Sequence, residues 1–171
     1  EQMYRRARMG VSYLAQEPSS FKHLSVEDNI WLILAARGIE TREANDRVDR
    51  LLGDVGVEDH RGQRAETLSG GERRRLEVAR ALATEPTFIL LDEPFAGIDP
   101  LAVLDLQRII RRLKSLGIGV LITDHNVRET LKITDRAYII KDGKIFATGD
   151  PVELSENRDV RRIYLGEDFT L

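Results

Sequence analysis

The sequence predicts an α/β fold in which a parallel sheet is combined with a largely helical segment. The apolar run Thr87–Leu91 is followed by a helical stretch and by a second apolar run, Gly119–Thr123. A strand, a helix and a strand in that order indicate a right-handed crossover in a parallel sheet. Residues 25–83 instead show helical periodicity. A chain of 171 residues is long enough for one domain, or for one domain with a smaller lobe.

Composition excludes several classes of protein. Hydrophobic residues make up 42% and charged residues 32% of the chain, which is a globular balance. A net charge of −3 argues against a broad basic face for nucleic acid. The absence of cysteine excludes disulfides, thiolate zinc sites and thiol nucleophiles. No apolar run approaches the ~20 residues that a membrane-spanning helix needs.

The first predicted strand is Val11–Ala15, and proline and serine after it indicate a loop that begins at Gln16. A glutamine at this position has two interpretations. It is either a solvated loop residue or an amide whose oxygen reaches a magnesium ion or an attacking water.

The helical segment begins at Ser25, where a serine followed by an acid three residues later is typical of a helix cap. A second amphipathic helix is predicted over Thr41–Val55. Phe21, Leu24 and Trp31 lie near the start of the segment. They are either core residues or an exposed patch that docks another protein.

A third helix is predicted from Ser69 to about Ala83, with Ser69 as its N-cap. Gly70 and Gly71 follow in the first turn, where glycine costs ~1 kcal/mol relative to alanine. Such glycines indicate that something approaches the backbone closely, and a helix N-terminus suits a phosphate. We interpret the arginines at positions 73–75 as a solvated face.

Carboxylates end the strand Thr87–Leu91, which we expect to be covered on both faces. Asp92 and Glu93 should point to opposite sides and have different roles, and they suit a hard cation and an activated water. Asp99 precedes a proline and is predicted to cap the next helix. His125 follows the strand Gly119–Thr123, and ligands gather at such strand ends.

The last part of the chain is predicted to contain a hairpin and a polar helix. Two strands, Arg136–Ile140 and Ile145–Thr148, flank an Asp-Gly turn. We expect this hairpin to form the tail of the sheet. The polar helix is expected to begin at Pro151.

Five motifs in this order resemble those of the ATPase subunits of ABC transporters. They are the Q-loop glutamine Gln16, the signature motif Leu68–Glu72, the Walker B strand Phe88–Pro94 with its glutamate, the D-loop Gly97–Asp99 and the switch histidine His125. The resemblance implies part of a RecA-like P-loop NTPase sheet with an inserted all-helical subdomain. The subdomain would cover about residues 25–83, the RecA-like core about 10–16 and 84–150, and a C-terminal helix and tail 151–171.

The resemblance also implies a role for each motif residue, with ATP and Mg²⁺ as cofactors. Asp92 and Gln16 would hold magnesium, Glu93 would be the general base, and His125 would contact the γ-phosphate. Ser69, Gly70 and Gly71 would bind the nucleotide of a second subunit, and Asp99 would lie at the interface of that head-to-tail homodimer.

Three further segments resemble the ATPases of lipopolysaccharide exporters: residues 91–97, 122–130 and 164–169. The expected function is therefore the ATP-hydrolysing subunit of such an exporter. It would be cytoplasmic and peripheral on the inner membrane, with permease subunits docking near Phe21, Leu24 and Trp31. The alternatives are the ATPase of a branched-chain amino-acid importer, a relative that acts on DNA or ribosomes, and a non-enzymatic short form that serves as a binding module.

One motif of the family does not occur in this sequence. The phosphate-binding pattern G-x-x-x-x-G-K-[ST] is absent, and Gly143-Lys144 lies in the predicted hairpin. We therefore expect an N-terminally truncated form that, on its own, neither binds ATP tightly nor hydrolyses it.

Overall fold

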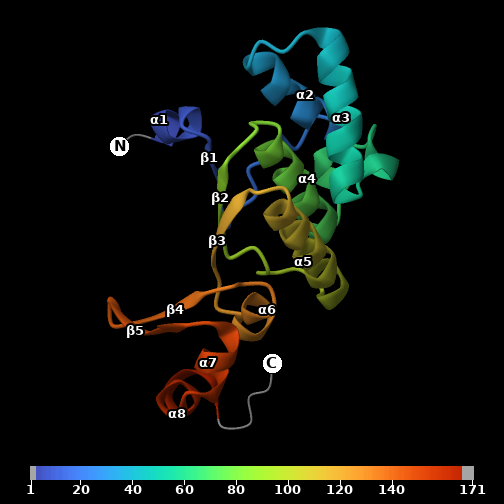
Figure 1. Cartoon of the computed structure of the whole chain (residues 1–171). Coiled ribbons are helices and arrows are strands. Elements are labelled where there is room, and N and C mark those ends of the chain that lie inside the picture. The colour runs from blue at the N-terminus through green and yellow to red at the C-terminus, as the bar shows by residue number, and fades with distance from the viewer. Residues whose placement is uncertain (1–2, 167–171) are drawn as a thin grey trace. The chain divides into compact units, whose positions relative to one another are not determined.

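The computed structural model describes residues 3–166 and divides into two compact units. The first unit ends at Thr123 and the second begins at Asp124. Figure 1 shows both units as ribbons. The helix α1 (Met3–Arg8), which the sequence did not predict, precedes the first strand.

The first unit contains the predicted parallel sheet. Its strands β1 (Val11–Leu14), β2 (Phe88–Asp92) and β3 (Gly119–Thr123) lie in the order β1-β2-β3. The register pairs Leu14 with Leu91 and Asp92 with Thr123. The strands therefore end together, and the residues that follow them meet at one edge of the sheet.

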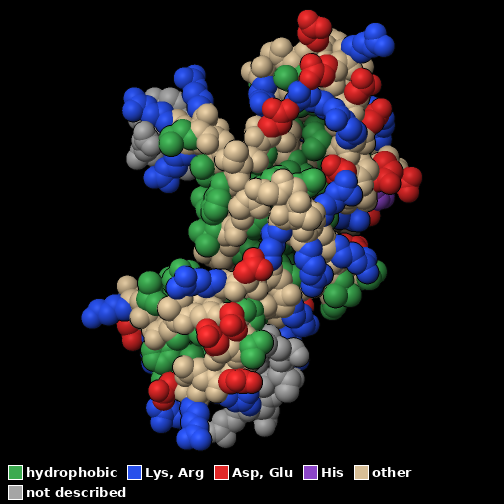
Figure 2. All heavy atoms as spheres, in the orientation of Figure 1, with side chains coloured by type: hydrophobic (Ala, Val, Ile, Leu, Met, Phe, Trp, Pro, Cys, Tyr) green, Lys and Arg blue, Asp and Glu red, His purple; other side chains and the backbone are tan. Residues whose placement is uncertain are grey.

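Two helices, α4 (Gly70–Leu82) and α5 (Pro100–Ser115), pack on the same face of this sheet (Figure 1). On the opposite face Tyr13, Phe88 and Leu121 are 47%, 38% and 49% exposed, and Figure 2 shows hydrophobic side chains on the surface over these strands. The prediction that β2 is covered on both faces is therefore wrong. Its apolar residues alternate between a covered face and an exposed one, because both helices lie on one side.

The helical segment contains α2 (Val26–Ala36) and α3 (Thr41–Val55), followed by short 3-10 turns and by α4. The hydroxyl of Ser25 accepts a hydrogen bond from the N–H of Asp28, so the predicted cap is confirmed. Fully buried side chains of α2 and α3, including Ile30, Leu34 and Leu52, form its core. These helices are held by burial of their apolar faces.

The turn between α4 and β2 fastens the helical segment to the sheet. Its residue Glu85 has a left-handed backbone with φ 52° and forms ion pairs with Arg37 and Arg47. Arg37 also donates to the carbonyl of Ala83 at 2.8 Å. The C-terminal end of α2 and the middle of α3 are thus tied to the turn that precedes β2.

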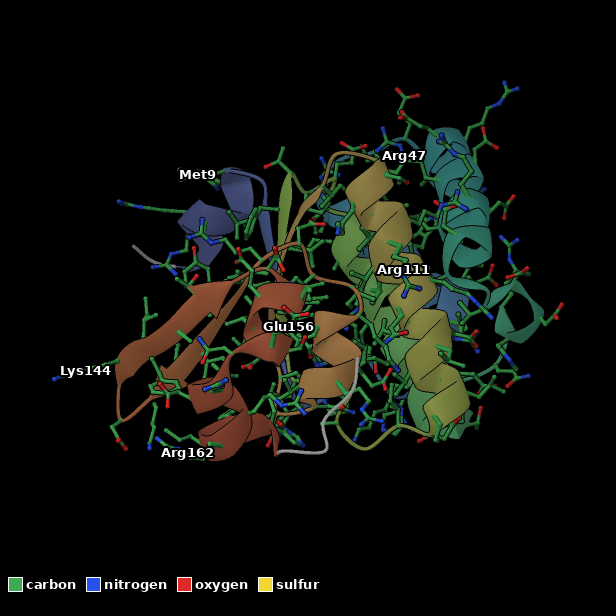
Figure 3. All side chains as sticks on the ribbon, turned by 60° about the horizontal axis from the view of Figure 1, so that its bottom comes forward. Met9, Arg47, Arg111, Lys144, Glu156 and Arg162 are labelled. Carbon is green, nitrogen blue, oxygen red and sulfur yellow. The ribbon has the colours of Figure 1, made fainter. Side chains whose placement is uncertain are left out.

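The second unit packs the helix α6 (Val127–Leu131) with a hairpin of β4 (Ala137–Lys141) and β5 (Lys144–Gly149). Lys144 stands at the turn end of this hairpin (Figure 3). The hairpin forms a separate two-stranded sheet, so its prediction as the tail of the parallel sheet is wrong. An antiparallel pair completes its hydrogen bonds locally and needs no further strand.

The predicted polar helix is divided into short pieces. They are α7 (Pro151–Glu156), α8 (Arg158–Val160) and a π turn at Arg161–Leu165. Asn157 ends α7 in an extended conformation and caps α8, which explains the break. Part of the segment 164–169, which contributed to the resemblance, lies outside the described residues.

Candidate functional site

The site begins at the carboxyl ends of β1, β2 and β3, where Asp92 joins all three strands. Its Oδ1 accepts the hydroxyl hydrogen bond of Thr123 at 2.6 Å, and its Oδ2 accepts that of Tyr13 at 2.9 Å. These two bonds, first that from Thr123, lower the pKa of the Asp92 carboxyl below its ordinary value. Asp92 is thereby kept ionised and oriented. Neither Tyr13 nor Thr123 was singled out from the sequence.

Glu93 directly follows β2 in a left-handed backbone conformation, with φ 43°. Its N–H donates to the carbonyl of Thr123 at 2.7 Å, and its own carbonyl accepts from Ala96 at 3.1 Å. A non-glycine residue in this region carries strain, and such residues concentrate at functional sites. The side chain of Glu93 is therefore directed by a turn rather than by the alternation of the strand.

Gln16 is brought to Glu93 by the end of β1. Its Nε2 donates to Oε2 of Glu93 at 2.9 Å, although the two residues are 77 positions apart in the chain. The contact joins the loop after β1 to the turn after β2. The sequence-predicted residues Gln16, Asp92 and Glu93 therefore lie together at one edge of the sheet.

Arg74 also reaches this edge, contrary to its interpretation as part of a solvated face. The residue is only 7% exposed and forms a buried ion pair with Glu77 on the same helix. Its guanidinium donates to the carbonyls of Ala15 and Asp92 at 2.7 and 3.0 Å. Arg74 could not be identified from the sequence, because three consecutive arginines give no sign that one of them points inward.

The signature turn at the start of α4 is built by a reciprocal cap. The N–H of Glu72 donates to the hydroxyl of Ser69 at 3.3 Å, and the N–H of Ser69 donates to the carboxylate of Glu72 at 2.8 Å. The second bond lowers the pKa of Glu72. The predicted N-cap is confirmed.

The two glycines of this turn differ in their surroundings. A Cβ added to Gly71 would lie 2.5 Å from Cβ of Ala102 on α5, whereas one added to Gly70 would make only ordinary contacts, 3.6 Å from the carbonyl oxygen of Gly97 and 3.8 Å from Cγ2 of Ile98. The close approach to Gly71 thus comes from the chain's own helix. Gly70 has the open backbone that a ligand could reach.

Asp99 caps α5 beside this turn. Its Oδ1 accepts from the N–H groups of Leu101 and Ala102, both at 3.0 Å, and Pro100 occupies the first helical position. The packing of Gly71 on Ala102 holds the caps of α4 and α5 together as one corner. Ser69, Gly70, Gly71 and Asp99 are therefore neighbours.

His125 belongs to the second unit, in the segment before α6. Its side chain is largely exposed, and its Nδ1 lies 3.9 Å from Oδ1 of Asp124. The side chain of Asp124 is fully buried and accepts a hydrogen bond from the N–H of Asn126 at 2.7 Å, which fixes the turn that carries the histidine.

The docking patch predicted near the helical segment is partly exposed. Phe21 and Trp31 are exposed and Leu24 is half-buried. The guanidinium of Arg80 stacks over the ring of Phe21 at 5.1 Å. Trp31 also lines a cavity of about 360 Å³, together with Glu27, Arg61 and residues of α3.

Asp92 and Gln16 carry the kinds of oxygen atom that bind magnesium. An ionised carboxylate and an amide supply the hard oxygen donors that Mg²⁺ prefers, and this ion is commonly held by only one or two protein carboxylates plus water and substrate phosphates. Within residues 3–166 no group of three or more His, Cys, Asp or Glu side chains converges as a metal cage. The donor set therefore fits a magnesium ion that is shared with a nucleotide.

The sheet with its terminal carboxylates and the capped signature turn define the class of the protein. The family model described as "ABC transporter" matches residues 1–96, and the chain belongs to this family. It is 51% identical to the lipopolysaccharide export system ATP-binding protein LptB of Escherichia coli K12, over 99% of this chain and 70% of the relative. It is 56% identical to an uncharacterized ABC transporter ATP-binding protein of Rhizobium meliloti, over 99% of this chain and 63% of that relative.

Solved structures show the same fold. The cbiO1 subunit from Clostridium perfringens, part of the ABC transporter complex cbiONQ, matches with a TM-score of 0.83 and 28% identity, over 94% of this chain and 64% of that one. The chain thus spans about two thirds of the length of the proteins that it matches. No helix among the described residues is both long and apolar enough to cross a membrane.

Proposed function

We propose that this chain forms the hydrolytic part of an ATP-hydrolysing ABC transporter subunit that exports lipopolysaccharide. The observation that carries the proposal is the convergence of Gln16, Asp92 and Glu93 at one edge of the sheet. The proposed substrate follows from relatives named as lipopolysaccharide export proteins, at 49–53% identity. The importer alternative has no observation in its favour.

In the proposed reaction Glu93 is the general base. Its carboxylate takes the proton of the water that attacks the γ-phosphate, and the hydrogen bond from Gln16 fixes the orientation of the acceptor. Asp92 and Gln16 would hold Mg²⁺, which neutralises developing charge on the phosphates when bound. His125 would contact the γ-phosphate.

The corner that contains Ser69, Gly70, Gly71 and Asp99 would serve a second subunit. Backbone N–H groups in the first turn of α4 and the positive end of its dipole suit a nucleotide phosphate. Asp99 would lie at the interface of a head-to-tail homodimer. The active protein would therefore contain two sites, each made from both subunits.

A permease partner would dock at Phe21, Leu24 and Trp31, which would place the subunit on the cytoplasmic face of the inner membrane. The exposed rings of Phe21 and Trp31 suit a partner helix that packs its apolar side chains on them. Genes for export permeases beside this gene would support lipopolysaccharide as the substrate. A neighbouring gene for a periplasmic binding protein would instead support the importer.

The proposal is tested in a completed protein, in which this chain is joined to the segments of the Escherichia coli relative that it does not match. Glu93→Gln should lower ATP turnover by about 10²–10⁴-fold, because it removes the general base. Nucleotide-dependent dimerisation should persist. Glu17→Gln, which changes an exposed carboxylate of the nearby loop, is the matched control and should retain turnover.

Two outcomes would contradict the proposal. One is turnover by Glu93→Gln near the parent rate, and the other is a completed protein that does not hydrolyse ATP. The 171-residue chain on its own is expected to show no turnover, since its sequence contains no phosphate-binding loop.

A further inference from the structure

Helix α4 carries a buried ion pair that the proposed reaction does not use. Arg74 and Glu77 lie 3.2 Å apart, and their side chains are 8% and 2% exposed. Burying two charges costs more than their attraction returns unless further hydrogen bonds satisfy them. The partners of the pair therefore indicate why it is present.

Those partners are backbone groups of three different segments. Arg74 donates to the carbonyl of Ala15, at the end of β1, and to that of Asp92, at the end of β2. Glu77 accepts from the N–H of Ser19, in the loop after β1, at 2.7 Å. The pair thus connects α4 to both strand ends and to the loop between β1 and α2.

The connected groups flank the hydrogen bond between Gln16 and Glu93. Ala15 and Ser19 lie on either side of Gln16 in the chain, and Asp92 immediately precedes Glu93. We propose that Arg74 and Glu77 are positioning residues, which hold the loop of Gln16 and the turn of Glu93 so that the two side chains meet. The expected effect on ATP turnover rests on the proposed function, whereas the positioning of the loop and the turn does not.

The first test uses the double variant Arg74→Gln/Glu77→Gln in the completed protein. Each single variant would leave one buried charge unpaired and is expected to unfold more readily, whereas the double variant contains neither charge. Its kcat should fall about 10- to 100-fold, since small misplacements of a catalytic group have effects of this size. Its KM for ATP should change by less than its kcat does, because Arg74 meets the backbone carbonyl of Asp92 and not the carboxylate that is proposed to hold Mg²⁺.

A mutant cycle separates positioning from general loss of structure. Adding Gln16→Ala to the double variant should lower kcat little further, because both changes disrupt one contact and are not additive. Arg75→Gln is the matched control, as Arg75 lies on the same helix and faces Asp105 of α5. Its kcat should be unchanged. A double variant with parent kcat, or fully additive losses with Gln16→Ala, would overturn the proposal.

The second test needs no activity and uses the 171-residue chain. Hydrogen exchange at the Ser19 N–H should be faster in the double variant than in the parent, while amides within α4 should keep their exchange rates. Unchanged exchange at Ser19, or a uniform rise across α4, would overturn the positioning role. If the completed protein hydrolyses no ATP, the proposed function fails, and hydrogen exchange still decides the positioning.

Discussion

Replacing Gly71 by alanine tests whether the signature turn is built by packing between helices. The added Cβ would lie 2.5 Å from Cβ of Ala102, about 1 Å short of ordinary carbon contact. Both atoms are close to the backbone, so α4 and α5 must move apart. Such overpacking costs about 1–3 kcal/mol, and the better helix propensity of alanine offsets about 1 kcal/mol of it. The expected net loss is therefore about 0–2 kcal/mol, and relative to Gly70→Ala, which gains a similar propensity, it is about 1–3 kcal/mol.

Gly70→Ala is the matched control, because its Cβ would make only an ordinary contact with the carbonyl of Gly97. This variant should be as stable as the parent or slightly more so. A second control is the double variant Gly71→Ala/Ala102→Gly, which adds a methyl group to α4 and removes from α5 the methyl group that it would meet. It should restore most of the lost stability.

Thermal unfolding of the 171-residue chain measures these effects. For a protein of this size 1 kcal/mol corresponds to about 2–4 °C, so Gly71→Ala should lower Tm by up to roughly 8 °C and should melt roughly 2–12 °C below Gly70→Ala. If Gly71→Ala and Gly70→Ala had the same Tm, Ala102 would not be what requires a glycine at position 71. Failure of Ala102→Gly to rescue the variant would lead to the same conclusion.

Three further predictions concern the site. Glu93→Gly should be more stable than Glu93→Ala by about 1 kcal/mol in urea unfolding, since only glycine adopts φ 43° without strain; equal stability would refute the strain. Thr123→Val should raise the pKa of Asp92, followed by carboxyl NMR. The pKa of Asp92 is lowered in the folded protein, so the hydrogen bond from Thr123 stabilises the fold only while Asp92 is ionised. The loss of unfolding free energy in Thr123→Val should therefore be complete above pH ~4 and should become smaller as the pH falls through the folded-state pKa. A loss that stays the same at low pH would contradict this role of the Thr123 hydroxyl. Asp99→Ala should cost about 1 kcal/mol by removing the cap of α5, and Asp99→Asn should cost less.

Features determined by neighbouring residues could be predicted from the sequence. The caps at Ser25, Ser69 and Asp99 use side chains that bond to N–H groups two or three positions later, so local patterns identify them. The strands β2 and β3 were predicted because crossover rules limit how such runs pair. The position of Asp92 and Glu93 at the carboxyl edge of the parallel sheet was predicted from the same rules.

Features determined by distant residues could not be predicted in this way. The burial of Arg74 depends on carbonyls 18 and 59 positions away, and its neighbours in the sequence do not distinguish it from a surface arginine. The hydroxyls of Tyr13 and Thr123 meet Asp92 only once the strand register is known. The close contact at Gly71 comes from Ala102 on α5, and the local sequence does not identify that neighbour.

The two hydroxyl bonds to Asp92 also bear on how the chain folds. Tyr13, Asp92 and Thr123 share one face of three different strands, and the register pairs Asp92 with Thr123. A slip of any strand by one residue would turn its side chains to the opposite face. A slipped β2 would direct the Asp92 carboxylate into the apolar layer beneath α4 and α5, without either hydroxyl to receive it. The carboxylate proposed to bind magnesium thus also disfavours the strand registers that would bury it without a partner.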